Sequence, residues 1–330
     1  MPESTNRHIP ELDGLRGIAI LMVMFGHGLV IGRGPVLGQF AVAGVSLFFV
    51  LSGFLITRIL IRSVERANYF QNFYLRRVLR IWPLYFLILG IAFLTPLFYF
   101  SHAVNPGYRY ALYIQNFWSM DDAPPILRTT WSLAIEEQFY LVWPLVVWLC
   151  NRKKRLGYIA IALIVVTPII RVLYHLHGID PYDATFGRMD GLAMGAALGV
   201  LSIAFPGASL RNAKFLAGCM AFSVALIPLL HYTLLRKAFK DTSTSLLFVS
   251  MVGTAFYWSG SKITRILRSS VLRYFGRISY CAYLIHMALF ERFSFVPAFA
   301  LIVVVASLSW YMFENPILLL KDRVTRPDPV

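Results

Sequence analysis

Charged residues are scarce in this chain, and cysteines are scarcer. Only 14% of its 330 residues are charged, whereas 58% are hydrophobic, and this balance excludes an ordinary soluble fold. The three cysteines, Cys150, Cys219 and Cys281, lie in or beside apolar runs without a paired spacing. We therefore expect an integral membrane protein with neither a disulfide framework nor a zinc site.

The short motifs that mark many soluble enzymes are also missing. The sequence has no glycine-rich phosphate loop followed by Lys-Ser or Lys-Thr, and no residue spacing typical of a metal site. Ser52, in FFVLSGFLI, is not surrounded by a nucleophile elbow or a Ser-His-Asp order. We expect Ser52 to serve in packing beside Gly53, and we expect no bound metal.

Acidic residues are outnumbered by basic ones. The chain has 16 Asp and Glu residues against 31 Lys and Arg, which gives a formal net charge of +15. A basic chain can bind nucleic acid, but here the basic residues form short clusters between apolar runs instead of one patch or tail. Membrane topology explains that placement better, so we expect no nucleic-acid partner.

Ten segments of mostly apolar residues are long enough to be read as membrane spans. The sixth is rich in glycine and the ninth is short, which makes these two the weakest. The first lacks a cleavage site and is not read as a signal peptide. With no repeat or second soluble domain visible, residues 1–330 are predicted to form one all-α, polytopic helix bundle. The segments lie near residues 17–32, 42–61, 81–100, 131–150, 156–174, 188–204, 215–234, 245–260, 278–291 and 295–316.

The lysines and arginines between these segments predict an orientation. Loops kept in the cytoplasm carry an excess of them, and most fall on one side when the N-terminus is placed inside. The outer segment from Arg236 to Lys240 departs from this rule. We therefore expect both termini in the cytoplasm and a multi-pass protein of the bacterial inner membrane.

The stretch ELDGLRGIAILMVMFGH opens with a charged turn that includes Asp13 and ends on a histidine. In a helix, Arg16 and His27 would lie about 16 Å apart along the axis and about 20° apart around it. Both side chains would line one face, with Arg16 at a membrane surface and His27 near mid-depth. Ionisable groups inside a bilayer usually face a cavity or pathway, although a hydrogen-bonded spacer in the bundle is an alternative.

Three arginines, Arg76, Arg77 and Arg80, enter the third segment in FYLRRVLRIWPLY. Their spacing of three and four residues predicts that they share one side of a helix. Guanidinium groups can grip phosphates with two hydrogen bonds, and a cytosolic coenzyme A thioester carries such phosphates. The alternative is topological, because positive-inside bias and anionic lipid headgroups also favour arginines here.

Two adjacent glutamates, Glu136 and Glu137, begin the fourth segment in TWSLAIEEQFYLVWP. Adjacent residues cannot share a helix face, so we expect one of them to point inward with Tyr140. A carboxylate in a span is costly unless it is paired or hydrated, and Arg188 or Arg128 is the expected counter-charge. Glu136 could position a base or bind an acceptor hydroxyl, or it could serve in a structural pair with Arg188.

The segment RMDGLAMG begins the sixth span with Arg188 and Asp190. Gly191 and Gly195, four residues apart, provide a small-residue face that permits close helix contact. We expect this segment to be mainly architectural.

His286 lies in FGRISYCAYLIH, within the ninth segment. By helical rise it lies about 12 Å from the inner end of that span, close in depth to His27. The two histidines could therefore line one cavity, or His286 could be a hydrogen-bonded core residue.

These blocks, together with GVSLFFVLSGFLIT and the late FENP, resemble the acyltransferase type 3 family of integral membrane O-acyltransferases. They occur in the family's order over residues 10–316. The family's Arg-x10-His signature falls on Arg16 and His27, its Arg-x-x-Arg element on Arg77 and Arg80, and its Trp-Ser-Leu block on residues 131–140. Cys281 departs from the pattern, since many relatives have serine there.

The resemblance implies a membrane O-acyltransferase. Members of the family move acyl groups, commonly acetyl from acetyl-CoA, onto hydroxyls of sugars in surface polysaccharides, lipopolysaccharide or nodulation factors, and some acylate macrolides. Acetyl-CoA would be a donor substrate and not a permanently bound cofactor. Some relatives carry an appended SGNH hydrolase-like domain. Because this sequence shows none before Val330, we expect transfer to be completed within the bundle or with a partner.

Our mechanistic hypothesis assigns a role to each candidate residue. His27 is assigned to catalysis, either as a general base or as a transiently acylated group. Arg16 would hold the donor or its thioester oxygen in place, and Glu136 would position the base or bind the acceptor hydroxyl. Acyl-CoA, a hydroxyl-bearing glycan and membrane lipid are the expected partners. The donor phosphates are assigned to Arg76, Arg77 and Arg80, and the supporting or substrate-binding positions are Asp13, Glu137, Tyr140, Arg188, Asp190 and His286.

A transporter or lipid-linked glycan exporter is the rival class, with His27, His286 and Glu136 as a proton or substrate route. The absence of repeat symmetry in the sequence argues against it. A catalytically silent membrane scaffold is a third alternative, and it predicts neither labelling by acetyl-CoA nor transport.

Overall fold

The computed structural model describes residues 8–30, 35–94, 106–120, 123–150, 153–207, 210–229 and 234–324. Nearly all of these residues are helical, and none of them forms a strand. The predicted all-α class is therefore confirmed. The helices are α1 (Pro10–Val30), α2 (Pro35–Ser63), α3 (Tyr69–Leu94), α4 (Gly107–Ala111), α5 (Pro125–Arg128), α6 (Thr130–Cys150), α7 (Lys153–Leu176), α8 (Thr185–Ala204), α9 (Leu210–Leu229), α10 (Leu234–Tyr257), α11 (Ser270–Phe290), α12 (Phe295–Ser309) and α13 (Asn315–Val324).

Each of the ten predicted segments overlaps a long helical region of the described chain, while residues 31–32, 95–100 and 230–233 of these segments lie outside the described residues. As far as the described residues extend, helices α9, α10 and α11 are not among the regions long and apolar enough to cross a membrane. The protein is thus a multi-pass membrane protein, while the count of ten spans and the cytoplasmic termini stay predictions. Within the part of the chain that the structure describes, seven regions meet the criterion, namely Pro10–Leu29, Phe40–Ser63, Tyr69–Leu94, Pro125–Cys150, Lys153–Leu176, Thr185–Ala204 and Phe295–Leu320.

Two helices begin well before the apolar segments that predicted them. The third segment was expected from residue 81, but α3 begins at Tyr69, and α10 begins at Leu234 instead of residue 245. The physical reason is that an apolar run marks only the part of a helix that suits lipid, whereas backbone hydrogen bonding continues through polar turns. The arginines at 76, 77 and 80 consequently lie inside α3.

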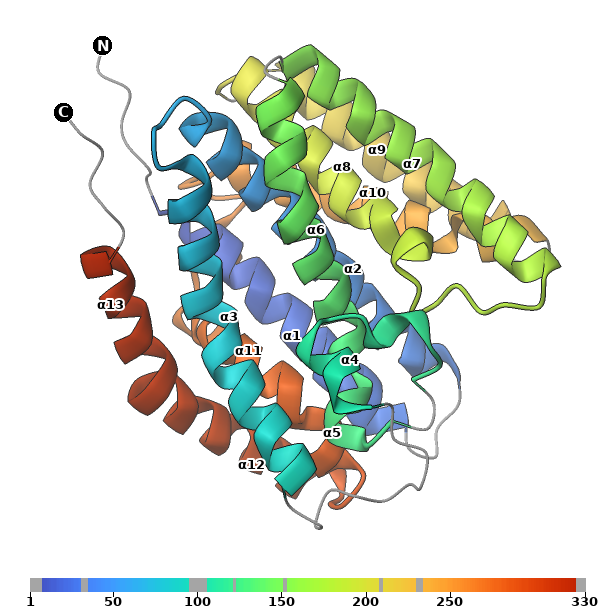
Figure 1. Cartoon of the computed structure of the whole chain (residues 1–330). Helices are drawn as coiled ribbons and strands as arrows, with labels where there is room; N and C mark the ends of the chain where they lie inside the picture. Colours follow the sequence, from blue (N-terminus) through green and yellow to red (C-terminus); the bar gives the residue numbers. More distant parts are fainter. Residues whose placement is uncertain are drawn as a thin grey trace.

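Helices α1 and α2 lie in the middle of the bundle, with α3 and α13 on one side and α7 and α9 on the other (Figure 1). Helix α1 packs against α2 and α11, and α2 also packs against α8. These central contacts bring α1, α2 and α11 together, three helices that carry candidate residues far apart in the sequence.

Glycines permit the closest of these helix contacts. A Cβ at Gly195 would lie 2.1 Å from the Val50 carbonyl oxygen, and a Cβ at Gly17 would lie 2.0 Å from the Leu272 carbonyl oxygen. No side chain fits at such distances, so both positions require glycine. The predicted architectural role of Gly195 is confirmed at the contact between α8 and α2.

Replacing Gly195 with alanine is expected to lower the thermal unfolding midpoint of the protein in detergent, since a methyl group would force α8 away from α2. Overpacking of this kind costs about 1–3 kcal/mol or more. Gly218→Ala in α9 is the matched control, because nothing lies within 4 Å of the methyl group that this change would add. That change should leave stability equal or raise it by up to ~1 kcal/mol through helix propensity. Equal midpoints for the two variants would contradict the close contact.

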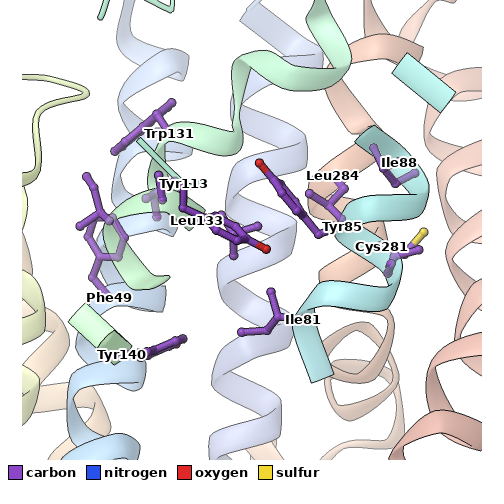
Figure 2. Packing of buried hydrophobic residues seen from close by; sticks show 14 of the residues in the cluster. Phe49, Ile81, Tyr85, Ile88, Tyr113, Trp131, Leu133, Tyr140, Cys281 and Leu284 are labelled. Carbon is purple, nitrogen blue, oxygen red and sulfur yellow. The ribbon is translucent and has the colours of Figure 1, made fainter. Parts of the chain in front are cut away.

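The apolar core is built where α2, α3, α6 and α11 meet. Figure 2 shows buried side chains from these helices, among them Phe49, Ile81, Leu133 and Leu284. Cys281 is also part of this cluster and is 2% exposed. The same four helices, together with α1, surround the polar cavity of the molecule.

Candidate active site

A cavity of about 850 Å³, part of it open to solvent, lies between α1, α2, α3, α6 and α11. One part of its wall is apolar and includes Val45, Phe49, Ile56 and Leu133. The polar part brings together residues from all five helices, which the sequence separates by up to 267 positions between residue 16 and residue 283. These polar residues are Arg16, Ser52, Arg77, Arg80, Ser132, Glu136, Tyr140, Ser279, Tyr280 and Tyr283.

Ser52, Glu136 and Tyr140 form a hydrogen-bonded group in this wall. The Ser52 hydroxyl donates to Glu136 Oε1 at 2.7 Å. The Tyr140 hydroxyl lies 3.1 Å from Ser52 Oγ and 3.3 Å from Glu136 Oε2. The expectation that one of the two glutamates points inward with Tyr140 is confirmed, and Glu136 is that residue.

The expectation that Ser52 serves in packing beside Gly53 is wrong. A Cβ at Gly53 would lie 2.0 Å from the Leu192 carbonyl oxygen, so Gly53 faces α8. Ser52 instead faces α6, where it reaches Glu136. Successive residues of a helix point about 100° apart, which is why two neighbours in α2 serve different contacts.

Glu137 lies on another face of α6, as adjacency predicts. Its Oε2 atom accepts a hydrogen bond of 3.2 Å from Trp82 Nε1 on α3. Glu137 does not line the cavity. The two glutamates therefore have separate surroundings, and only Glu136 shares the cavity with the arginines.

The counter-charge expected for Glu136 was wrong. Arg188 pairs with Asp241 at 2.6 Å, and Arg128 pairs with Glu291 at 2.6 Å. The positive groups that share the cavity with Glu136 are Arg16, Arg77 and Arg80.

Helix α3 supplies two of the three predicted arginines to the cavity. Arg77 and Arg80 line it, one turn apart, and the Arg77 guanidinium carbon lies 5.7 Å from the centre of the Tyr140 ring. Arg76 is exposed and is not part of the lining. The physical reason is that Arg76 and Arg77 point about 100° apart, so the expected grouping of all three on one side is corrected to two.

Arg16 is positioned from its own helix. Its Nη1 atom lies 3.2 Å from Asp13 Oδ1, one turn earlier in α1, and Asp13 also contacts His8 Nε2 at 2.6 Å. Asp13 is therefore a supporting residue that restrains the Arg16 side chain at the cavity wall.

His27 and His286 meet at the far end of α1. Their Nδ1 and Nε2 atoms are 3.0 Å apart, and the rings are stacked with centroids 5.0 Å apart. The predicted similarity in depth is confirmed. The mid-depth position of His27 in the membrane stays a prediction, and within α1 this residue lies in the last turn.

The hydrogen bonds of this pair determine which nitrogen of His27 can act as a base. His286 Nδ1 lies 2.7 Å from the Tyr283 carbonyl oxygen, which can only accept, so this nitrogen carries a proton. In a neutral ring His286 Nε2 is then an acceptor, and His27 Nδ1 donates to it. His27 Nε2 is left with its lone pair.

The histidine pair adjoins the cavity without lining it. Tyr283 lies between the cavity and the histidine pair. It lines the cavity, and its ring centroid is 5.6 Å from that of His286. Phe48 packs edge-on against Tyr283 at 6.2 Å. The Tyr283 hydroxyl is anchored to Ser132 at 2.5 Å. The expectation that Arg16 and His27 face one cavity or pathway is not met by this cavity, which Arg16 lines and His27 does not; Tyr283, with Phe48 packed against it, forms a partition on the side of His286.

Arg188 and Asp190 belong to a buried ionic network outside the cavity. Asp190 on α8 pairs with Arg171 on α7 at 2.6 Å, and both side chains are almost fully buried. Thr242 on α10 donates to Asp190 at 2.5 Å. In the loop before α8, burial raises the pKa of Tyr182 above its ordinary value, although the nearby Arg188 acts in the opposite direction. The network joins three helices, which agrees with the architectural role expected for this segment.

Comparison with known protein families matches the sequence of this chain to one of them. A family model described as an acyltransferase domain covers residues 9–314. The chain belongs to this acyltransferase family. The resemblance seen in the sequence is therefore confirmed, and the cavity residues Arg16, Ser52, Arg77, Arg80 and Glu136 all lie within the matched region.

Several acyltransferases are similar to the chain over most of its length. The peptidoglycan O-acetyltransferase OatA of Listeria monocytogenes is 29% identical over 86% of this chain and 49% of its own. YrhL of Bacillus subtilis, provisionally named as a peptidoglycan O-acetyltransferase, is 30% identical over 94% of this chain and 55% of its own. The chain thus spans about half the length of these curated relatives. No solved structure matched it.

Sequence reasoning missed two features of this site. One is the bond from Ser52 to Glu136, and the other is the partition made by Phe48 and Tyr283. The aromatic partition could have been suspected from the tyrosine three residues before His286. No local signal identifies the partner of Ser52.

Proposed function

We propose that this chain transfers an acyl group, acetyl in the first instance, from an acyl-CoA thioester to a hydroxyl group of a cell-surface glycan. The observation that carries the proposal is the cavity in which Arg16, Arg77 and Arg80 accompany Glu136. Such a cavity suits a polyanionic donor whose reactive end needs a base. The family and the names of the relatives support acyl transfer as the chemistry.

The donor is assigned to the arginines of α3. Arg77 and Arg80 present two guanidinium forks one turn apart, and such forks bind phosphate oxygens bidentately. Coenzyme A has phosphates at one end and the thioester at the other. With its phosphates on these arginines, its thioester end would extend into the cavity toward Ser52, Glu136 and Tyr140. Acetyl-CoA would be a consumed substrate.

The acceptor is assigned by its chemistry as a sugar hydroxyl. Peptidoglycan is the first acceptor to test, because the names of two relatives contain it. Surface polysaccharide, lipopolysaccharide and macrolides follow from the wider resemblance. We place the protein in the bacterial inner membrane, with the arginine end of the cavity toward the cytoplasm.

His27 is the base assigned to the acceptor hydroxyl. Its Nε2 lone pair is left available by the bond from its Nδ1 to His286. Imidazole suits this step because its ordinary pKa lies near neutrality. For the acyl group to reach this base, the partition of Phe48 and Tyr283 has to move.

The test is acetyl transfer by the purified full chain in detergent. Radiolabelled acetyl-CoA is supplied with peptidoglycan fragments, and mass spectrometry looks for one added acetyl group on a hydroxyl. Release of free CoA together with an acetylated glycan is expected. Gradient-driven uptake into vesicles, with neither CoA release nor acetylated product, would instead favour a transporter.

The structure weakens the transporter alternative. A proton or substrate route through Glu136, His27 and His286 needs the three groups in one passage. Glu136 lines the cavity, but the two histidines lie beyond Phe48 and Tyr283.

The arginines of α3 give a separate prediction. The Arg77→Gln/Arg80→Gln double variant should raise the KM for acetyl-CoA by at least ~10-fold, because charge-assisted hydrogen bonds are worth about 1.5–3 kcal/mol each. Arg76→Gln is the matched control, since Arg76 lies on the same turn but outside the cavity. Steady-state CoA release measures both. An unchanged KM in the double variant would mean that Arg77 and Arg80 serve only in membrane topology and do not bind the donor.

A further inference from the structure

Ser52 is oriented unlike most serines in the helices of the described chain, although Ser309 at the end of α12 also donates to a glutamate, the nearby Glu314. A helical serine commonly satisfies its hydroxyl by donating to a carbonyl oxygen one turn earlier. Ser52 Oγ instead donates to the side chain of Glu136 on a different helix. Serines that follow the common pattern are Ser46 to Val42, Ser63 to Ile59, Ser223 to Cys219 and Ser250 to Leu246.

The surroundings of Ser52 are those of an activated nucleophile. Its Oγ–H donates to a carboxylate oxygen at 2.7 Å, which is the geometry of a nucleophile beside its base. The Tyr140 hydroxyl contacts both Ser52 and Glu136 and restrains the orientation of the two side chains. Arg16 lines the same cavity, where a cation can stabilise negative charge that develops on a carbonyl oxygen.

We propose that Ser52 is a covalent relay: its Oγ takes the acyl group from the donor thioester before the group passes to the acceptor hydroxyl. This inference rests on the proposed function and adds a first half-reaction to it. A thioester is the co-reactant, and no oxidant or reductant is needed.

Two half-reactions make up the relay. In the first, Ser52 Oγ attacks the thioester carbonyl carbon, and its proton passes to the Glu136 carboxylate. The carbon–sulfur bond breaks, the coenzyme A thiolate takes up the proton from Glu136, and free thiol leaves. The product is an ester on Ser52. In the second half-reaction the acceptor hydroxyl gives its proton to His27 Nε2, once the partition has moved, and its oxygen attacks the carbonyl carbon of the ester. The bond between that carbon and Ser52 Oγ breaks, Ser52 Oγ takes up the proton, and the acylated acceptor departs.

The partition explains what a relay achieves in this fold. Ser52 faces the cavity with Arg16, and Arg16 lies about 16 Å along α1 from His27 by helical rise. Tyr283 lies between the cavity and His286, and Phe48 packs against the Tyr283 ring. An ester on Ser52 retains the acyl group while CoA leaves, so the donor site and the acceptor site need not be open at the same time.

Trapping the ester on the full-length protein tests the relay. The wild type is incubated with [1-14C]acetyl-CoA without acceptor, quenched in acid and digested for mass spectrometry. Label is expected on the peptide that contains Ser52. It should resist neutral hydroxylamine and be lost in alkali, as an oxygen ester is, whereas an acyl-imidazole would decay at neutral pH.

Substitutions separate a relay from a structural serine. Ser52→Ala should lose the label and at least ~10²-fold of the transfer rate. Ser52→Cys should carry a label that neutral hydroxylamine removes, because the bond is now a thioester. Ser250→Ala, a buried serine bonded within its own helix, should label like the wild type. Gel filtration in detergent checks that each variant is folded.

The outcomes also separate the relay from the proposed function. His27→Ala should keep the label on Ser52 without passing it on. Normal transfer by Ser52→Ala, or label on His27 in place of Ser52, would overturn the relay and leave acyl transfer standing. A wild-type protein that neither releases CoA nor acylates any acceptor would overturn both.

Discussion

Replacing His27 by alanine is expected to reduce acetylation of the acceptor by about 10³-fold while the protein still inserts and folds. The reason is that His27 Nε2 carries the lone pair left by the hydrogen bonds of the pair, and loss of a general base typically costs about 10²–10⁴-fold. The measurement is the rate of acetyl ester formation on a glycan by purified protein. Wild-type activity in this variant would remove His27 from the mechanism.

A matched control for His27→Ala is His177→Ala. His177 is exposed beyond the last turn of α7 and bonds only the Leu173 carbonyl among the contacts described for its ring. Its replacement should leave the transfer rate unchanged. A loss similar to that of His27→Ala would show that the assay reports insertion rather than chemistry.

His286 provides an internal check on the same prediction. It fixes the Nδ1 proton of His27, so His286→Ala should lower the transfer rate by a smaller factor, about 10-fold, and should change the pH dependence of transfer. The His27→Ala/His286→Ala double variant should be no slower than His27→Ala, because groups that act as a unit have non-additive effects. Additive losses would instead assign separate roles to the two histidines.

Converting residue numbers into positions along a helix predicted those parts of the site that depend on one helix or on two parallel helices. The spacing of Arg77 and Arg80 placed both in one cavity wall. Depth along two helices that run in the same direction brought His27 and His286 into contact. In both cases the helix period and rise are constants, so residue numbers convert directly into positions.

Counting could not predict which helices are neighbours. By charge alone, Arg188 and Arg16 were equally good partners for Glu136. Arg188 instead forms an ion pair with Asp241, because α10 places Asp241 beside it. The hydrogen bond from Ser52 to Glu136 likewise forms only because α6 lies beside α2. Such pairings arise from tertiary packing over long sequence separations, and no local pattern encodes them.

The largest effect on stability is expected from Asp190→Ala. Asp190 and Arg171 are 2% and 1% exposed and lie 2.6 Å apart. Removing the carboxylate leaves a guanidinium buried without its counter-charge, which costs about 3–5 kcal/mol. The thermal unfolding midpoint in detergent should fall sharply, and the expressed yield should fall with it.

The position of Arg171 makes this cost hard to avoid. Its Nε donates to the Gly187 carbonyl oxygen at 2.6 Å, and its Nη1 donates to the Ala238 carbonyl oxygen at 2.7 Å and to Thr242 at 2.8 Å. These bonds hold the guanidinium between α7, α8 and α10, so the side chain cannot turn toward water when Asp190 is lost.

Glu291→Ala is the control that separates burial from charge pairing. Glu291 pairs with Arg128 at the same 2.6 Å, but both side chains are about one-third exposed. A pair of this kind is worth about 0–1 kcal/mol, so its loss should shift the midpoint little. A double replacement of Arg171 and Asp190 by apolar residues of similar size should recover part of the stability lost in Asp190→Ala. Equal shifts for Asp190→Ala and Glu291→Ala would mean that α7, α8 and α10 are held together by apolar packing, and that the buried ion pair adds nothing to it.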